Sequence, residues 1–181
     1  MKRSALSLFV VLCCTLALGL AHDPRTTAKN FSHQLQIEGA GNLALNYKGM
    51  HFNNDTYQRM KGDDKFRERM NQGLWSDIGT ADAAFDVVAG DQTISKGKYT
   101  LGLSIEANDS FAVVLKSSSK TVKIPLKTTT ENVDVPFLTF SLFPTEKPDT
   151  FVLEGRCGKF RGTADVKVPY LADHSHTAPH K

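Results

Sequence analysis

A group of carboxylates around the single tryptophan is the feature of the chain that comes nearest to chemistry. Asp77, Asp82, Asp86 and Asp91 follow Trp75 within 16 positions. Two carboxylates that face one cleft about 5 to 10 Å apart can act as acid and base in glycoside hydrolysis, and an aromatic ring beside acidic groups can hold a sugar. A lone tryptophan near a helix end is also typical of a plug that closes one end of a β-sandwich, because tryptophan prefers mostly buried positions. We favour the role of a plug for the Trp75 ring. The candidate ligand-binding residues of this segment are Trp75, Asp77 and Asp82.

Histidines offer a second candidate chemistry, because His174, His176 and His180 lie close together near the end of the chain. Imidazoles two positions apart can share a metal ion. A usable site needs rigid side chains held by further hydrogen bonds, and this polar segment predicts a flexible tail. We therefore expect no metal or other cofactor, and a metal site at the three histidines stays an alternative.

Nucleophilic catalysis has no support in the sequence. No serine stands in a glycine-flanked elbow, and no cysteine has a supporting histidine. Cys157 is the only cysteine after residue 21, and its place in an alternating apolar run predicts a buried, inert thiol. The sequence therefore names no catalytic residue.

The first 21 residues have the pattern of a secretory signal peptide. Lys2 and Arg3 precede an apolar run from Ala5 to Leu20, and Ala21 supplies a small residue at the expected cleavage site. A run this short, with no second apolar segment after it, predicts no stable membrane insertion once it is cleaved. We expect an exported protein, periplasmic or extracellular.

The remaining 160 residues have the size of one domain. Without Lys2 and Arg3 they carry 20 basic and 19 acidic side chains, a net charge of +1. A chain so close to neutral has no field that favours nucleic acid, so no nucleic-acid partner is expected. We assign a flexible lead-in to residues 22–30, one domain to residues 31–171 and a disordered tail to residues 172–181.

Short runs of alternating apolar residues fill most of that domain. Turn residues such as Gly, Asp, Asn and Ser separate the runs, which is typical of an antiparallel sandwich or barrel. The fold class that we predict is all-β, an antiparallel β-sandwich of about 8 to 9 strands. The runs are 34–38, 43–47, 85–89, 99–105, 111–115, 122–126, 133–143, 151–157 and 163–170.

The segment from Lys48 to Asp77 departs from this alternation. Asp63 can cap a helix in which Phe66 and Met70 lie four residues apart, and Gly73 can end it. We expect one short amphipathic helix in this loop insertion, lying over a sheet edge or the mouth of the sandwich.

The stretch from Leu74 to Leu103 resembles the core of a bacterial exported family known as domain of unknown function 2911. The chain departs from the family at Ser76, where a basic residue is usual, and at Ala81 and Asp82, where an Asn-Glu pair is usual. The resemblance implies a β-sandwich in the bacterial envelope or secreted from it, and it implies no reaction. The residues that carry it are Trp75, Gly79, Ala83, Phe85, Gly90, Ile94, Gly97, Tyr99 and Leu101.

These observations favour a non-enzymatic binding module. The irregular segment from Lys48 to Thr80 interrupts a regular series of strands, and sandwiches usually carry recognition on such segments. A carbohydrate or another envelope protein is the expected partner. Two alternatives stay open: a hydrolase that uses carboxylates between Trp75 and Asp86, and a metal-binding envelope protein built on the histidine tail.

Overall fold

The computed structural model describes residues 28–174, which form nine strands and three short helices. The elements along the chain are β1 (Lys29–Ile37), β2 (Gly41–Gly49), α2 (Asn54–Gly62), α3 (Asp64–Gln72), β3 (Gly79–Ala83), β4 (Val87–Ala89), β5 (Gln92–Ile94), β6 (Gly97–Ile105), β7 (Phe111–Lys116), β8 (Thr121–Pro144), β9 (Thr150–Lys167) and α4 (Pro169–His174).

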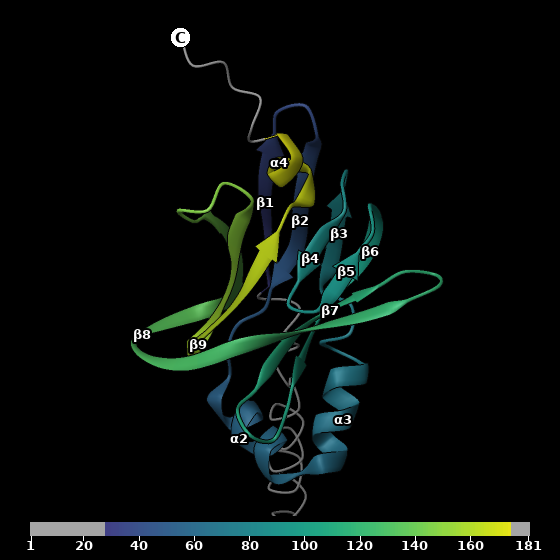
Figure 1. Ribbon diagram of the computed structural model, residues 1–181. Coiled ribbons are helices and arrows are strands. Elements are labelled where there is room, and N and C mark those ends of the chain that lie inside the picture. Colours follow the sequence, from purple (N-terminus) through teal and green to yellow (C-terminus); the bar gives the residue numbers. More distant parts are fainter. Residues whose placement is uncertain (1–27, 175–181) are drawn as a thin grey trace, which may run out of the picture.

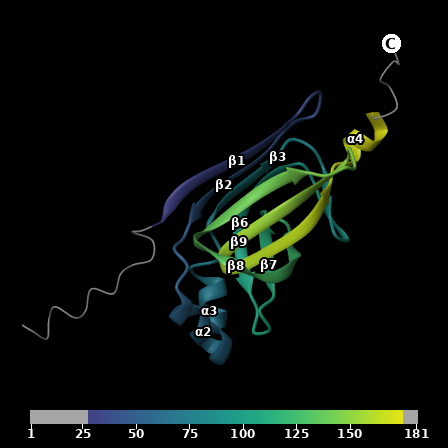
Figure 2. The same cartoon turned by 90° about the vertical axis from the view of Figure 1, so that its left-hand side faces the viewer.

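All strand pairs are antiparallel, in the order β1-β2-β3-β6-β7-β8-β9-β4-β5. The long strand β8 divides this sheet into two layers. Its first part, up to Leu126, pairs with β7, and from Lys127 onward it pairs with β9. Figures 1 and 2 show the two layers packed face to face, with α2 and α3 together at one end and α4 at the other. The predicted all-β antiparallel fold is confirmed.

Hairpin turns stand where the turn residues predict them. The β1–β2 hairpin turns at Gly39 and Gly41, whose φ angles of 76° and 109° lie in a region that residues with a side chain rarely adopt. Asp109, with a φ of 62°, turns the chain between β6 and β7. Aspartate tolerates this conformation better than most residues. Local turn chemistry therefore fixes both hairpins.

The structure corrects three details of the predicted organisation. First, the runs 122–126 and 133–143 belong to one strand, β8, and the runs beginning at 151 and 163 belong to β9. Second, one helix was expected, and the structure adds α2 and α4 to the predicted helix, α3. Third, β1 begins at Lys29, inside the segment assigned as a flexible lead-in, and α4 extends to His174, inside the assigned tail. Residues 1–27 and 175–181, which include the predicted signal peptide, lie outside the described residues.

The two layers are joined on the side where β8 passes β1 and β2. Backbone hydrogen bonds link Leu138 N to Met50 O at 2.9 Å and Phe52 N to Pro136 O at 2.8 Å. Further along, the Tyr47 hydroxyl accepts from Phe140 N at 2.6 Å and donates to Phe140 O at 3.1 Å. Between Pro136 and Phe140, this edge of β8 therefore has backbone partners outside the β8–β9 ladder.

None of the helices in the described part of the chain is long and apolar enough to cross a membrane.

Candidate ligand-binding groove

A groove of about 690 Å³ lies between the beginning of α2 and the middle of β8 and β9. In Figure 1, α2 lies below the bend of these two strands. The volume is in the range that small-molecule sites occupy. The residues lining the groove are His51, Phe52, Asn54, Tyr57, Gln58, Thr130, Asp134, Pro136, Lys159 and Phe160.

Aromatic rings form the floor of this groove. The ring centroids of Tyr57 and Phe160 are 4.8 Å apart, and those of Phe52 and Tyr57 are 5.8 Å apart. Phe111 packs beneath them, 5.2 Å from Phe160. Tyr57 is buried, whereas Phe52 and Phe160 are partly exposed. The floor therefore offers two partly exposed rings on a rigid aromatic base.

Phe52 can lie in the floor because a glycine stands beneath it. Gly158 on β9 has a φ of 59°, and a Cβ added there would meet the Phe52 ring at 2.6 Å. Gly158 pairs with Val135 at an irregular part of the β8–β9 ladder, where the register shifts on both sides. Such bulges bend a strand and redirect its side chains. The groove lies beside this irregular part of the ladder, since Asp134, Pro136 and Lys159 line it.

Helix α2 is fixed at both ends. The Asn53 side chain caps its first turn by accepting from Thr56 N at 2.8 Å. Later in the helix, the Tyr57 hydroxyl donates to Asp109, and Lys61 Nζ lies 3.0 Å from the same carboxylate. The hydrogen bond from Tyr57, together with Lys61, holds the pKa of Asp109 below its ordinary value. Burial, with Asp109 adding to it, raises the pKa of Tyr57.

Polar side chains form the rim. His51, Asn54, Gln58, Thr130, Asp134 and Lys159 are all exposed and line the groove. They present hydrogen-bond donors and acceptors and both signs of charge. Cys157 is buried, as predicted, and burial together with the nearby Asp134 raises the pKa of its thiol to about 12.

The structure does not bring the predicted residues Trp75, Asp77 and Asp82 into one site. Trp75 is only 7% exposed and belongs to the core, as the plug interpretation predicts. Asp77 is exposed and lines a separate hollow beside Tyr47 and Lys48. Asp82, on β3, lies 3.6 Å from Lys98. The three residues thus lie in three different settings, the core, a surface hollow and strand β3, and their part in ligand binding stays a prediction.

The other carboxylates of the predicted cluster have structural partners. Asp86 accepts from Lys96 N at 2.7 Å, and Asp91 accepts from Gln92 at 3.0 Å, both at the surface. Neither residue is among those lining the hollow at Asp77. Of the four carboxylates, Asp77 alone lines the hollow beside Tyr47, and the hydrolase alternative stays a prediction.

The histidine alternative falls largely outside the described residues. His176 and His180 lie there, and of His174 the structure gives only its place at the end of α4. Among residues 28–174, no group of three His, Cys, Asp or Glu side chains could hold a metal ion.

The groove residues were missed because they come from three distant parts of the chain, 51–58, 130–136 and 159–160. Only the first part lies in the segment from Lys48 to Thr80 that the sequence marks for recognition. One local signal in the sequence could have located the first part of the groove. Asn53 can cap a helix, and Asp55 places an acidic residue in the first turn of that helix.

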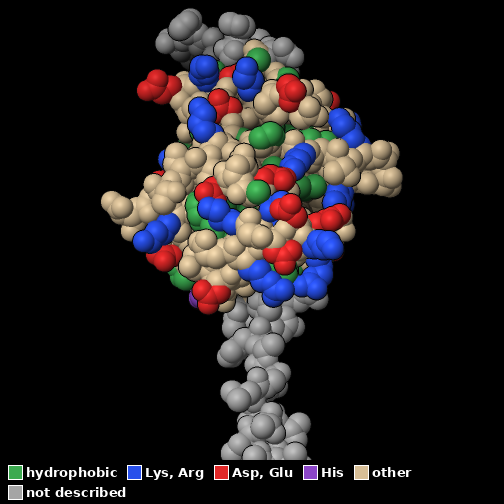
Figure 3. Space-filling view, turned by 90° about the horizontal axis from the view of Figure 1, so that it is seen from below, with side chains coloured by type: hydrophobic (Ala, Val, Ile, Leu, Met, Phe, Trp, Pro, Cys, Tyr) green, Lys and Arg blue, Asp and Glu red, His purple; other side chains and the backbone are tan. Residues whose placement is uncertain are grey.

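Charges of both signs are interspersed over the face of the molecule shown in Figure 3. This agrees with the nearly balanced composition.

No protein-family model, curated protein or solved structure matches the chain.

Proposed function

We propose that this protein is an exported, non-enzymatic β-sandwich module that binds a carbohydrate of low net charge in the groove. The observation that carries the proposal is the combination of two partly exposed rings, Phe52 and Phe160, with an exposed polar rim. A sugar has an apolar C–H face and a belt of hydroxyl groups. An aromatic floor and a rim of donors and acceptors match those two features.

The charge of the rim supports a ligand of low net charge. Asp134 and Lys159 carry opposite charges, and Asn54, Gln58 and Thr130 are neutral. A strongly charged ligand would meet repulsion from one of the two ionised groups. Hydroxyl groups can use both a carboxylate and an ammonium group as partners. The groove thus suits a polyol better than an anion or a cation.

Two further expectations belong to this proposal. Export rests on the signal-peptide pattern of residues 1–21. The groove also uses His51 to Gln58, which lie in the irregular segment expected to carry recognition. A resident of the envelope or the extracellular space meets polysaccharides, so the location and the ligand class are consistent. The resemblance to the exported family adds location and fold, and no activity.

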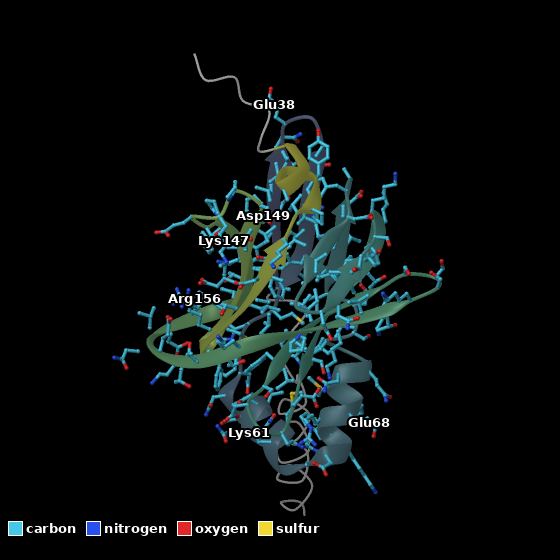
Figure 4. The ribbon with its side chains drawn as sticks, in the orientation of Figure 1. Glu38, Lys61, Glu68, Lys147, Asp149 and Arg156 are labelled. Carbon is cyan, nitrogen blue, oxygen red and sulfur yellow. The ribbon has the colours of Figure 1, made fainter. Side chains whose placement is uncertain are left out.

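The experiment is a binding titration of the purified chain from residue 22 with a panel of neutral oligosaccharides, by calorimetry and by ligand-observed NMR. The groove variant combines Gln58→Ala, Asp134→Asn and Lys159→Ala. The matched control combines Gln36→Ala, Asp91→Asn and Lys147→Ala, which are the same substitutions at exposed positions. In Figure 4, Lys147 lies toward the end of the molecule opposite Lys61 of α2.

We expect at least one oligosaccharide to bind, the groove variant to weaken binding about tenfold or more through lost hydrogen bonds, and the control to bind like wild type. The oligosaccharide should also stay uncleaved after long incubation. Equal loss in both variants, or no binding across the panel, would contradict the carbohydrate proposal. Cleavage products would contradict its non-enzymatic part.

A further inference from the structure

A second site lies inside the sandwich, separate from the groove. A cavity of about 40 Å³ lies between the two layers, and it shares no lining residue with the groove. A space of about 10 to 15 Å³ on this measure can hold one water molecule. The cavity is therefore large enough for a guest. Its lining residues are Leu43, Leu45, Ala81, Ala83, Val87, Ile94, Tyr99, Leu101, Val113, Leu115, Ile124, Phe140, Leu142, Leu153 and Val166.

The chemistry of the lining excludes water as a well-held occupant. Fourteen of the fifteen lining side chains are wholly apolar. The remaining one, Tyr99, directs its hydroxyl to Ser95 O at 2.7 Å. A buried water needs two to four polar partners. The cavity therefore favours an apolar guest, which would regain the dispersion contacts that an empty space forfeits.

Short side chains on β3 explain why the cavity exists. This strand lies in the middle of the layer that contains β1, β2, β3, β6, β7 and the first part of β8. On β3, the inward positions are occupied by Ala81 and Ala83. Ala81 is paired with Leu45 on one side and Tyr99 on the other, and Ala83 is paired with Leu43 and Gly97. Larger residues flank the two alanines on nearly every side. The sheet is therefore thinnest at β3, and the opposite layer does not fill the gap.

Tyr99 marks the place where the cavity comes nearest to solvent. It is the only lining residue that is not buried. Its hydroxyl hydrogen bond to Ser95 holds the ring within the turn region before β6, next to Gly97. A guest could enter by displacement of this one ring, without separation of the two layers.

From this geometry we infer that the sandwich interior binds a compact apolar molecule of a few heavy atoms, which enters past Tyr99. The inference is independent of the carbohydrate proposal, because the two sites have no residue in common.

The test uses xenon as the probe and the ¹³C-labelled methyl groups of the chain from residue 22 as reporters. We expect saturable shifts at the methyl groups that line the cavity, among them Leu43, Val87 and Leu115. Ala81→Val should fill the cavity, abolish these shifts and leave the urea midpoint of unfolding unchanged or higher. The control is Ala89→Val, at a fully buried alanine that does not line the cavity. It should keep the xenon shifts and lower the midpoint, because it overpacks the core.

Ala83→Val serves as a second filling variant if Ala81→Val does not fold. Tyr99→Phe, which keeps the ring and removes its hydrogen bond, should exchange xenon severalfold faster than wild type. Absence of saturable shifts in wild type, or shifts that persist in both filling variants, would overturn the site. An unchanged exchange rate in Tyr99→Phe would overturn the route.

Discussion

At the scale of single residues, buried polar groups decide where the two layers meet. Tyr47 is 5% exposed, and its hydroxyl satisfies both the N–H and the C=O of Phe140. His33 adds a similar contact, since its Nε2 accepts from Leu142 N at 3.1 Å. Leaving a buried backbone N–H without a partner costs more than a hydrogen bond gains. The Tyr47 and His33 side chains therefore hydrogen-bond to the backbone of β8 as a neighbouring strand would.

Replacement of Tyr47 tests this role. We expect Tyr47→Phe to lower the free energy of unfolding by about 1 to 3 kcal/mol, because Phe140 N would lose its partner in a buried place. Urea unfolding measures the change. Tyr99→Phe is the control, since its hydroxyl bond is exposed and its loss should cost less than about 1 kcal/mol. Equal costs for both variants would show that the Tyr47 hydroxyl does not hold β8.

We expect the attachment of α2 through Asp109 to depend on pH. The pKa of this carboxylate is lowered in the folded chain by Tyr57 and Lys61. A lowered pKa contributes stability that is present above the ordinary pKa and is lost as the pH falls through the folded value. Asp109→Asn keeps a residue that tolerates the positive φ. Its deficit in unfolding free energy should therefore be largest above about pH 4 and shrink below it.

Unfolding of wild type and Asp109→Asn at a series of pH values gives this difference. Glu106, whose pKa is lowered mainly by its hydrogen bond with Lys123, titrates in both proteins. Its contribution cancels in the comparison. A deficit that stays constant down to pH 2 would mean that the carboxylate charge does not contribute to the attachment.

At the scale of elements, sequence patterns located most of the hairpins and one of the two helices in the insertion. The glycines of the β1–β2 turn and the cap of α3 at Asp63 are local signals, and both are confirmed. Helix α2 was missed although its signal is of the same kind: Asn53 caps it, and its buried residues Tyr57 and Met60 lie three positions apart. The length of β8 and β9 was missed because polar stretches such as 127–132 resemble turns. Pairing with a distant partner strand keeps them extended.

Gly158 lies at the bulge in β9 and beneath the Phe52 ring of the groove floor. Gly158→Ala places a Cβ against Phe52 at a positive φ. Gly90 is the matched control, because its φ of 63° is almost the same and nothing lies within 4 Å of an added Cβ. We expect Gly90→Ala to cost about 1 to 2 kcal/mol of stability from backbone strain alone. Gly158→Ala should cost about 1 to 3 kcal/mol more from overpacking.

Thermal or urea unfolding of both variants isolates the contact with Phe52. If the two alanine variants lose the same stability, the strain lies in the backbone and Phe52 adapts at no cost. The groove would then not depend on Gly158.

At the scale of the whole molecule, neither the groove nor the cavity follows from any one segment. The groove joins residues about 100 positions apart, and the cavity is lined from both layers. The sequence predicts strands because alternation is local, whereas the path of β8 from one layer to the other is set by long-range packing. The residues Trp75, Asp77 and Asp82 show the same limit: they are near in sequence, yet Trp75 lies in the core, Asp77 in the segment before β3 and Asp82 on β3.

The path of β8 also predicts how the molecule unfolds. Because β8 pairs with β7 in one layer and with β9 in the other, separation of either layer breaks hydrogen bonds of a strand that both share. We expect a single cooperative transition in urea.

Trp75, the only tryptophan, reports by fluorescence on the core beside β6, where its carbonyl accepts from Leu103 N at 2.8 Å. Amide signals of β4 and β9 report on the second layer. Coincident midpoints are the expected result, since coincidence of independent probes is the mark of two-state unfolding. Earlier loss of the β4 and β9 signals would instead show that the layers are separate folding units, joined by β8 without being coupled through it.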